Sequence, residues 1–189
     1  ERCDLCVLVI DVADGLTTQE KGILSDIERE KKGCIIYVNK WDTVHGNRME
    51  HAKQGLIQEA PFLKFCPIIF GSALQGRNLN RLFETAKEVY EQLQRRISTS
   101  ELNSFLERAM QLNHPPMILG KRLRVYYMSQ IKTAPPQFIL FVNYKDRMTA
   151  TYEKYLMNEF RKKYGFNGVP LTFYLRKKSQ KELPHLAAH

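Results

Sequence analysis

The sequence predicts an α/β domain with a parallel sheet, followed by a small α+β domain, and three observations support this prediction. Continuous apolar runs alternate with amphipathic stretches over the first half of the 189 residues, which is typical of parallel strands joined by crossover helices. The second half follows a different order of helix, strand, strand, helix and strand. The charge divides at the same place, because residues 1–100 carry 14 basic and 14 acidic side chains, whereas residues 101–189 carry 15 and 6. We therefore expect domains at residues 1–97 and 98–178, with a basic, flexible tail at 179–189.

Each expected element of the first domain has its own local signal. Three short, continuous apolar runs predict buried strands at residues 6–10, 34–38 and 67–70. Thr17 or Thr18 can cap a helix that continues to about residue 32. Further helices are expected at 48–59 and 79–96, and the second of these has apolar residues at helical spacing: Leu79, Leu82, Phe83, Ala86, Val89, Tyr90 and Leu93.

The second domain is expected to be a small sheet backed by helices, because each of its elements has one apolar face. Ser98 and Glu101 fit a capping box, with apolar residues following at helical spacing. In chain order the expected elements are a helix from residue 98, a loop at 113–120, strands at 123–131 and 138–144 joined by residues 133–136, a helix at 151–164 and a strand at 169–175.

Polar segments follow the three expected strands of the first domain. Ligands of parallel α/β sheets bind beyond the carboxyl ends of the strands. Those ends carry Asp11, the quartet Asn39-Lys40-Trp41-Asp42 and the segment Gly71-Ser72-Ala73-Leu74. The topology alone therefore places two candidate base-binding loops at one edge of the sheet.

The Asn-Lys-x-Asp quartet has the chemistry of a guanine reader. The Asp42 carboxylate can accept hydrogen bonds from guanine N1–H and the exocyclic amine, and an unpaired, buried carboxylate would disfavour other bases. The aliphatic stem of Lys40 can lie over the base, while Asn39 ties the loop to its neighbours. Backbone N–H groups at Ser72 and Ala73 are expected to meet guanine O6. The predicted guanine-binding residues are Asn39, Lys40, Trp41, Asp42, Ser72, Ala73 and Leu74.

Trp41, a member of the quartet, and Asp11, at the end of the first strand, have alternative roles. Trp41 can pack beneath the loop or form a wall of the base pocket. Asp11 can organise the end of its strand or touch the ligand, and we favour the first role. For the quartet itself the alternative is a solvated loop, but its place at a strand end, with Ser-Ala at the next strand end, favours guanine binding.

The phosphate-binding half of a nucleotide site is missing from the sequence. It contains no G-x-x-x-x-G-K-[S/T] motif and no Asp-x-x-Gly segment ahead of residue 6. We therefore expect the chain to be the rear part of a P-loop GTPase fold, with the phosphate loop, the switches and all catalytic residues upstream of Glu1.

Other site classes find little support in the sequence. No run approaches the length of a membrane helix, and no signal peptide opens the chain. Cys3 and Cys6 form a C-x-x-C, but no second pair follows, which favours four reduced cysteines in a cytoplasmic protein over a redox or metal site. The five histidines show no metal-ligand spacing, and we predict no metal ligand in this chain.

These segments closely resemble the Der (EngA) family of bacterial GTPases, which carry two GTPase domains and a terminal KH-like domain. The motifs that resemble the second GTPase domain are Asp11-Val12-Ala13-Asp14-Gly15-Leu16-Thr17, Asn39-Lys40-Trp41-Asp42 and Ser72-Ala73-Leu74. Those that resemble the KH-like domain are Ile97-Ser98-Thr99, Leu102-Asn103, Gly120-Lys121-Arg122-Leu123, Pro135-Pro136, Phe141-Val142-Asn143 and Gly165-Phe166-x-Gly168-Val169-Pro170. The resemblance covers nearly everything up to about Arg176.

The resemblance implies a cytoplasmic GTPase that binds the large ribosomal subunit and rRNA and acts in ribosome biogenesis. It implies GTP or GDP with Mg²⁺ as ligands of the intact protein. Because the sequence lacks the phosphate-binding half of the site, we expect no tight nucleotide binding by this chain alone. It also implies that the missing upstream GTPase domain packs on the KH-like domain.

The second domain offers two kinds of candidate RNA contact. Gly165-Phe166-Asn167-Gly168 fits the Gly-x-x-Gly string of RNA-binding KH modules, but it lies between the last helix and the last strand, so we interpret it as a helix C-cap and turn. Basic clusters are better candidates for phosphate contact, although a solvated basic face is the alternative. They comprise Lys121, Arg122, Arg124, Arg161, Lys162, Lys163, Arg176, Lys177 and Lys178.

Two alternatives to a truncated ribosome-assembly GTPase remain open. One is an RNA-binding module with an incomplete, non-catalytic nucleotide domain, as in an Era-like relative. The other is a domain-docking module whose KH-like sheet faces another domain of the same protein.

Overall fold

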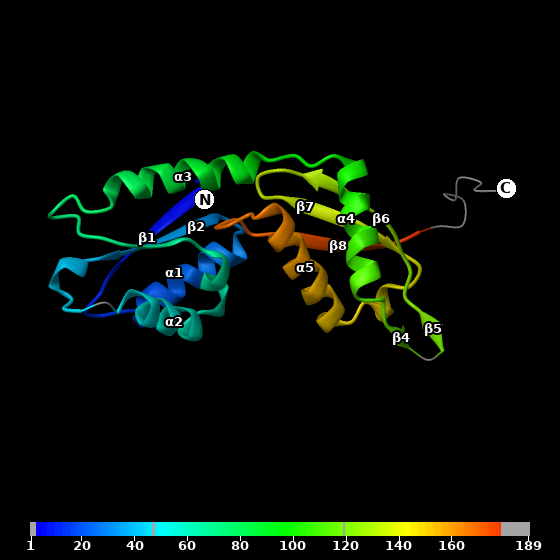
Figure 1. Cartoon of the computed structure of the whole chain (residues 1–189), viewed down its shortest axis with the longest axis horizontal. Coiled ribbons are helices and arrows are strands. Elements are labelled where there is room, and N and C mark those ends of the chain that lie inside the picture. Colours follow the sequence, from blue (N-terminus) through cyan, green and yellow to red (C-terminus); the bar gives the residue numbers. More distant parts are fainter. Residues whose placement is uncertain (1–2, 47, 119, 179–189) are drawn as a thin grey trace. The chain divides into compact units, whose positions relative to one another are not determined.

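The computed structural model describes residues 3–46, 48–118 and 120–178, and these form two compact units (Figure 1). The first unit contains the described residues up to Arg95 together with Thr133–Pro136 and Phe166–Leu171. The second contains Arg96–Lys132, Gln137–Gly165 and the described residues from Thr172 onward. Two short segments that come late in the sequence therefore pack with the first unit. The expected division at residue 97 assigned both of them to the second domain.

The first unit is built on a parallel sheet with the strand order β1-β2-β3. Its strands are β1 (Leu5–Asp11), β2 (Gly33–Asn39) and β3 (Ile68–Phe70). The helices α1 (Thr18–Arg29) and α2 (Met49–Glu59) lie on one side of this sheet and α3 (Leu79–Gln94) on the other (Figure 1). This arrangement, a parallel sheet with helices on both faces, is the α/β class that the sequence predicted.

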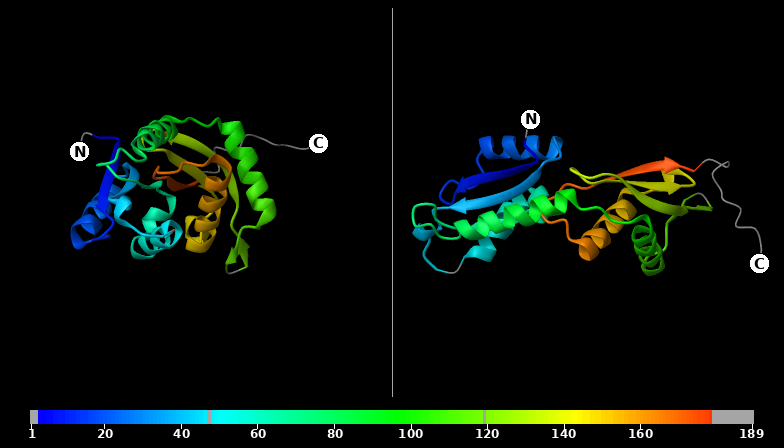
Figure 2. Two further views of the ribbon diagram at one scale, coloured as in Figure 1. Left: turned by 60° about the vertical axis from the view of Figure 1, so that its left-hand side comes forward. Right: turned by 90° about the horizontal axis from the view of Figure 1, so that it is seen from above.

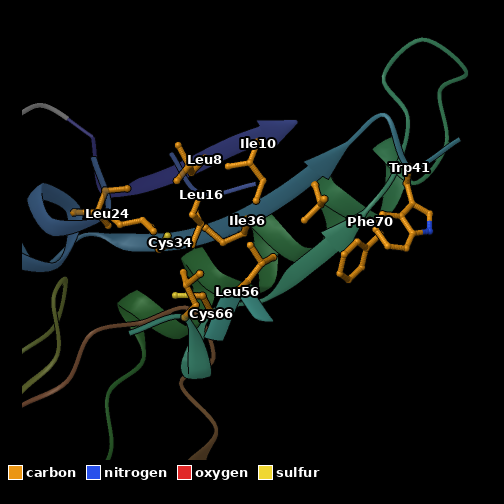
Figure 3. Packing of buried hydrophobic residues seen from close by; sticks show 13 residues of the cluster. Leu8, Ile10, Leu16, Leu24, Cys34, Ile36, Trp41, Leu56, Cys66 and Phe70 are labelled. Carbon is orange, nitrogen blue, oxygen red and sulfur yellow. The ribbon is translucent and has the colours of Figure 1, made fainter. Parts of the chain in front are cut away.

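The core of the first unit explains why these segments form these elements. Every residue of β2 from Gly33 to Val38 is buried, as the continuous apolar run predicted. Leu24 of α1 and Leu56 of α2 pack with Leu8 and Ile36 of the sheet in one hydrophobic cluster (Figure 3). Thr17 caps α1 in a complete capping box, because its hydroxyl accepts from Gln19 N–H and its own N–H donates to the Glu20 carboxylate.

The second unit is a three-stranded mixed sheet with two helices on one face. β6 (Val125–Lys132) pairs with β7 (Gln137–Val142) in antiparallel fashion, and β7 pairs with β8 (Thr172–Lys177) in parallel fashion. α4 (Thr99–Leu112) and α5 (Ala150–Tyr164) lie on the same side of this sheet (Figure 2). Their apolar faces are buried, and these faces include Leu102, Phe105 and Phe160. Edge-to-face ring contacts join Phe160 to Phe105, Phe138 and Phe173. The expected α+β class is confirmed.

Three details of the fold differ from the sequence predictions. The expected loop at 113–120 contains part of a small antiparallel hairpin, β4 (Met117–Ile118) and β5 (Lys121–Arg122). The last strand begins at Thr172 instead of Val169, because the segment before it makes its backbone hydrogen bonds with the first unit. The predicted apolar face of α3 is only partly covered, and Phe83 and Tyr90 remain 70% and 49% exposed.

Short 3₁₀ helices complete the described chain: η1 (Trp41–Thr43), η2 (Pro61–Phe65) and η3 (Lys145–Arg147). The predicted flexible tail at 179–189 lies outside the described residues, and β8 extends to Lys177. None of the helices in the described part of the chain is long and apolar enough to cross a membrane.

Candidate nucleotide site and basic surface

The two candidate base-binding loops lie side by side at the carboxyl ends of β2 and β3. Gly71 N–H donates to the Val38 carbonyl at 2.9 Å, and Trp41 N–H donates to the Gly71 carbonyl at 2.9 Å. The Asn39 side-chain oxygen accepts from Ala73 N–H at 2.9 Å. Asn39 therefore ties the Asn-Lys-x-Asp loop to the Ser-Ala loop, as the sequence predicted.

Asp42 and Lys40 present their charged groups beside these loops. Asp42 is half-buried, and none of the described residues donates a hydrogen bond to its carboxylate or pairs with it. Lys40 has a left-handed backbone with φ of 59°, and its ammonium lies 2.5 Å from Asp11 Oδ2. This hydrogen bond, with a second from Ala13 N–H, lowers the pKa of Asp11, and the same partner raises the pKa of Lys40. Asp11 therefore organises the strand end, which is the role that we favoured.

Trp41 packs beneath the loop and does not form a wall of an open pocket. Its indole is buried and lies 4.4 Å from the Phe70 ring, centroid to centroid, within the hydrophobic cluster (Figure 3). Of the two roles considered for Trp41, the structure shows the packing role. The indole stabilises the short helix η1, from which Asp42 projects.

The Ser-Ala loop has fewer free donors than the sequence analysis assumed. Ser72 N–H donates to the Arg77 carbonyl at 3.2 Å, and Ala73 N–H is bound to Asn39 as described above. Leu74 is 93% exposed, and its N–H has no partner among the described residues. Of these three N–H groups, the one at Leu74 is the free donor for a base oxygen.

Residues that the sequence analysis did not single out hold this loop in place. The buried Tyr37 hydroxyl donates to the Arg77 carbonyl at 2.9 Å, and Asn78 donates through its side chain to the Phe70 carbonyl at 2.6 Å. A Cβ atom at Gly71 would overlap the Tyr37 hydroxyl and the Arg77 carbonyl. Tyr37 lies inside an apolar run, so its sequence context indicated only a core position. A Gly at the start of the loop was the one signal of close packing there.

The cysteines do not form a reactive or metal-binding site in the described residues. Cys34 and Cys66 are buried, and a hydrogen bond between them together with burial raises the pKa of Cys34. The Cys3 and Cys6 sulfurs lie 3.5 Å apart, and burial raises the pKa of Cys6 to about 11. Both shifts favour the unreactive thiol over the thiolate. Within the described chain, no group of three or more His, Cys, Asp or Glu side chains could hold a metal ion.

The structure brings two of the three predicted basic clusters together. Lys121 of β5 and Lys177 of β8 both approach the Tyr144 ring, at 5.9 and 6.0 Å from its centroid. Beside them, Arg176 lies over Phe141 and Lys178 over Tyr127. The remaining predicted members of these clusters, Arg122 and Arg124, are exposed.

The third cluster occupies the last turn of α5. Lys162 pairs with Glu159 at 2.5 Å, and Lys163 lies over the Phe105 and Tyr164 rings. Arg161 is half-buried on the same turn. Basic residues in the last turn also stabilise a helix, because their positive charges interact favourably with the negative end of the helix dipole.

The Gly-x-x-Gly string forms a helix C-cap and a packed turn, which confirms our interpretation. Gly165 ends α5 with φ of 80°, and its N–H donates to the Arg161 carbonyl at 2.8 Å. Gly168 N–H donates to the Phe65 carbonyl, and the Gly168 carbonyl accepts from Cys34 N–H at 2.8 Å. Because these backbone groups are already paired inside the first unit, the Gly168 end of the turn is closed to a nucleic-acid strand.

Comparisons with known proteins identify both halves of the chain. Residues 96–176 match the family described as "KH-domain-like of EngA bacterial GTPase enzymes, C-terminal", and residues 1–92 match the "Elongation factor Tu GTP binding domain". GTPase Der of Protochlamydia amoebophila is 55% identical over 184 residues, which are 97% of this chain and 38% of that protein. GTPase Der of Fusobacterium nucleatum is 40% identical over 182 residues, 95% of this chain and 41% of that protein. The chain thus spans about two fifths of the length of these relatives.

Solved structures give a weaker likeness. A crystal structure of Aquifex aeolicus Era bound to GDP and AlF4⁻ is 15% identical, with a TM-score of 0.41, and the match covers 94% of this chain and 66% of that one. A likeness at this level supports no inference about ligands.

Proposed function

The chain belongs to the family of GTPase Der, and from this premise we propose that residues 1–97 are the guanine-reading part of a GTP-binding domain. One observation carries the proposal. The Asn39–Ala73 hydrogen bond joins the loops after β2 and β3, with the unpaired Asp42 carboxylate beside them. A carboxylate held at a strand end without a protein partner is suited to a ligand that offers two donors.

Guanine offers that pair of donors. Asp42 accepts from N1–H and from the exocyclic amine, while Leu74 N–H donates to O6 and the stem of Lys40 lies over the base. Asn39 contributes indirectly, because it holds the two loops together. Adenine presents a different donor and acceptor pattern at these positions, and it would leave the carboxylate unpaired.

In the intact protein, we propose, this site serves GTP hydrolysis with Mg²⁺. The phosphate loop, the switches and the catalytic residues would then lie upstream of Glu1, in the part of the relatives that this chain does not span. Mg²⁺ and phosphate-binding groups supply the electrostatic stabilisation of phosphoryl transfer. The present residues would supply base specificity alone, which is why tight nucleotide binding by this chain alone is not expected.

The second unit is proposed to bind RNA on the large ribosomal subunit during ribosome biogenesis in the cytoplasm. This proposal is supported by the net positive charge of residues 101–189, which contain 15 basic and 6 acidic side chains. The clusters around Lys121, Lys177 and Arg161 are the proposed phosphate contacts, and the upstream GTPase domain is a proposed packing partner. Contacts of this kind position an RNA strand without reading its sequence.

The guanine assignment can be tested by changing the base reader. In the intact protein, Asp42→Asn should weaken GDP binding at least tenfold and raise the affinity for xanthosine diphosphate, because the new amide can donate to the C2 oxygen of xanthine. Competition between the two nucleotides measures this preference.

Asp26→Asn is the matched control, because Asp26 is an exposed carboxylate on α1 that pairs with Arg29. It should leave the preference unchanged. If Asp42→Asn still preferred guanine as strongly as the control does, Asp42 would not be the base reader.

A further inference from the structure

Arg147 is a buried cation of the second unit that has no hydrogen-bond or ion-pair partner among the described residues. It lies in η3, and its residue is only 7% exposed. Its Nη1 atom is buried and has no hydrogen-bond partner within the described part of the chain. Among the described residues, no carboxylate forms an ion pair with Arg147. Protein interiors rarely keep a guanidinium donor in this condition, because both its charge and its N–H group favour an acceptor.

The Tyr144 ring covers this guanidinium but does not satisfy it. The Arg147 Cζ atom lies 3.8 Å from the ring centroid, which is a close cation–π contact. Such a contact stabilises the cation against the face of the ring, yet it provides no acceptor in the plane of the guanidinium, where the N–H groups point. Tyr144 itself is 36% exposed, so the ring forms the outer surface of the cluster.

Two lysines from distant parts of the sequence flank the same ring. Lys121 of β5 and Lys177 of β8 are exposed, and their ammonium groups lie 5.9 and 6.0 Å from the Tyr144 centroid. Neither forms an ion pair with a described carboxylate. Asp146, the acidic neighbour of Arg147, is exposed and forms no such pair either. The cluster therefore carries three positive charges that no carboxylate of the described residues neutralises.

The Asn143 side chain fixes the backbone around the cluster. Its oxygen accepts from Arg124 N–H and Tyr144 N–H, both at 2.9 Å, and its amide donates to the Arg122 carbonyl at 3.0 Å. These bonds connect the segment after β5 to the end of β7, so Asn143 holds the hairpin that carries Lys121 close to Tyr144.

We propose that Tyr144, Arg147, Lys121 and Lys177 form a phosphate site that holds one backbone phosphodiester of an RNA strand. Guanidinium and ammonium groups gathered around one ring suit a phosphate, whose oxygens accept several charge-assisted hydrogen bonds at once. The lysines attract the phosphate at the rim, and displacement of the Tyr144 ring gives it access to the buried donor of Arg147. The proposal rests on RNA binding by this unit as proposed above, and it adds the residue on which one contact depends.

The first test compares Arg147→Met with Arg108→Met in the whole chain. Arg108 is an exposed arginine of α4 in the same unit, so both variants lose one positive charge. Thermal unfolding is measured in chloride and in inorganic phosphate at equal ionic strength. We expect Arg147→Met to unfold in chloride at the wild-type temperature or above it, because an unpaired buried charge is removed. We also expect that phosphate raises the unfolding temperature of the wild type and of Arg108→Met but not that of Arg147→Met.

The second test measures binding of a short single-stranded RNA across a range of salt concentrations. Arg147→Met should weaken binding about tenfold, as expected for the loss of a charged hydrogen bond, and should lower the log–log salt slope by about one. Arg108→Met should change the affinity by less than about twofold. Lys121→Met combined with Lys177→Met changes two exposed side chains, so it tests the same site if Arg147→Met fails to fold.

The outcomes separate this inference from the proposed RNA function. If the wild type binds RNA and Arg147→Met behaves like Arg108→Met in both tests, the phosphate site is wrong while RNA binding stands. If phosphate stabilises the wild type through Arg147 but no RNA binds, the site serves a free phosphate group and the assignment to RNA is overturned. The proposal is supported if Arg147→Met loses both the stabilisation by phosphate and the wild-type affinity for RNA, while Arg108→Met keeps both.

Discussion

The two ends of the central strand β2 are built in opposite ways, although they belong to one continuous buried run. At its carboxyl end the chain turns outward, Lys40 is exposed, and the Asp42 carboxylate has no partner among the described residues. At its amino end Cys34 is fully buried, and its N–H is bonded to the carbonyl of Gly168. The difference shows that one strand serves two purposes, because packing at its amino end fixes the strand and leaves the other end available for a ligand.

This comparison predicts that substitutions at the amino end lower stability more than substitutions at the carboxyl end do, and that the effects on binding arise at the carboxyl end. The single tryptophan of the chain, Trp41, lies in the core of the first unit. Its fluorescence during urea denaturation therefore reports on the unfolding of this unit, whichever end is changed.

The largest effect on stability is expected at the amino end, from Gly168→Ala. An added Cβ would lie 2.8 Å from the Cys34 carbonyl oxygen and 2.9 Å from both Pro67 Cδ and Val89 Cγ2, and the backbone φ of 72° is unfavourable for alanine. The overlap and the strain together should lower the free energy of unfolding by about 3 kcal/mol. Denaturation followed by Trp41 fluorescence measures the change.

Gly15→Ala is the matched control for this substitution, because Gly15 lies in the same unit as Gly168 and Trp41. Its φ of 64° is also positive, but nothing lies within 4 Å of the added Cβ. Its free energy of unfolding should therefore fall only by the cost of the positive φ for alanine, about 1–2 kcal/mol. Equal losses at the two glycines would mean that the turn is not packed as described.

The turn at Gly168 also shows what the sequence could and could not predict about the fold. Gly165 and Gly168 predicted a turn after the helix, and that prediction is confirmed. The alternating apolar residues from Val169 predicted a strand, but the segment up to Leu171 packs with the first unit instead. Local pattern predicts an extended conformation, but it does not identify the backbone with which that segment pairs.

The helix α3 gives the same lesson for helices. Its apolar spacing predicted one continuous buried face, and Val89 and Leu93 are buried as expected. Phe83 on the same helix remains exposed. Periodicity shows which residues share a face of a helix. How many of them are buried depends on how much of that face other parts of the fold cover.

The candidate sites were predictable where they depend on topology, and less so where they depend on single contacts. Parallel strands place their carboxyl ends at one edge, so the proximity of Asn39 and Ala73 followed from the order of elements. Arg147 had no such signal, because an arginine between Asp146 and Met148 resembles any surface position. Only the fold shows that it is buried beneath Tyr144.

A moderate effect is expected from Tyr37→Phe, which tests how the carboxyl end of β2 supports the loop at 71–77. The change removes the hydrogen bond from the Tyr37 hydroxyl to the Arg77 carbonyl and leaves the ring in place. That carbonyl keeps a second donor, Ser72 N–H, so the loss should be only about 1 kcal/mol. A change within the error of the urea measurement would show that the buried hydroxyl does not hold the loop.

The smallest effect is expected from Lys40→Met, which removes the exposed ion pair between Lys40 and Asp11 at the carboxyl end. The pair lowers the pKa of Asp11, so its stabilisation is present above the ordinary aspartate pKa of 3.8 and is lost as pH falls through the lower folded value. It also raises the pKa of Lys40, so the stabilisation is present below 10.5 and is lost as pH rises through the higher folded value. The variant should therefore be slightly less stable than the wild type near neutral pH, and the two should converge at acidic pH. Urea denaturation at pH 7 and in strong acid measures this difference. A gap that widened on acidification would show that the ion pair with Asp11 is not what stabilises the strand end, and that Lys40 acts there through its aliphatic stem.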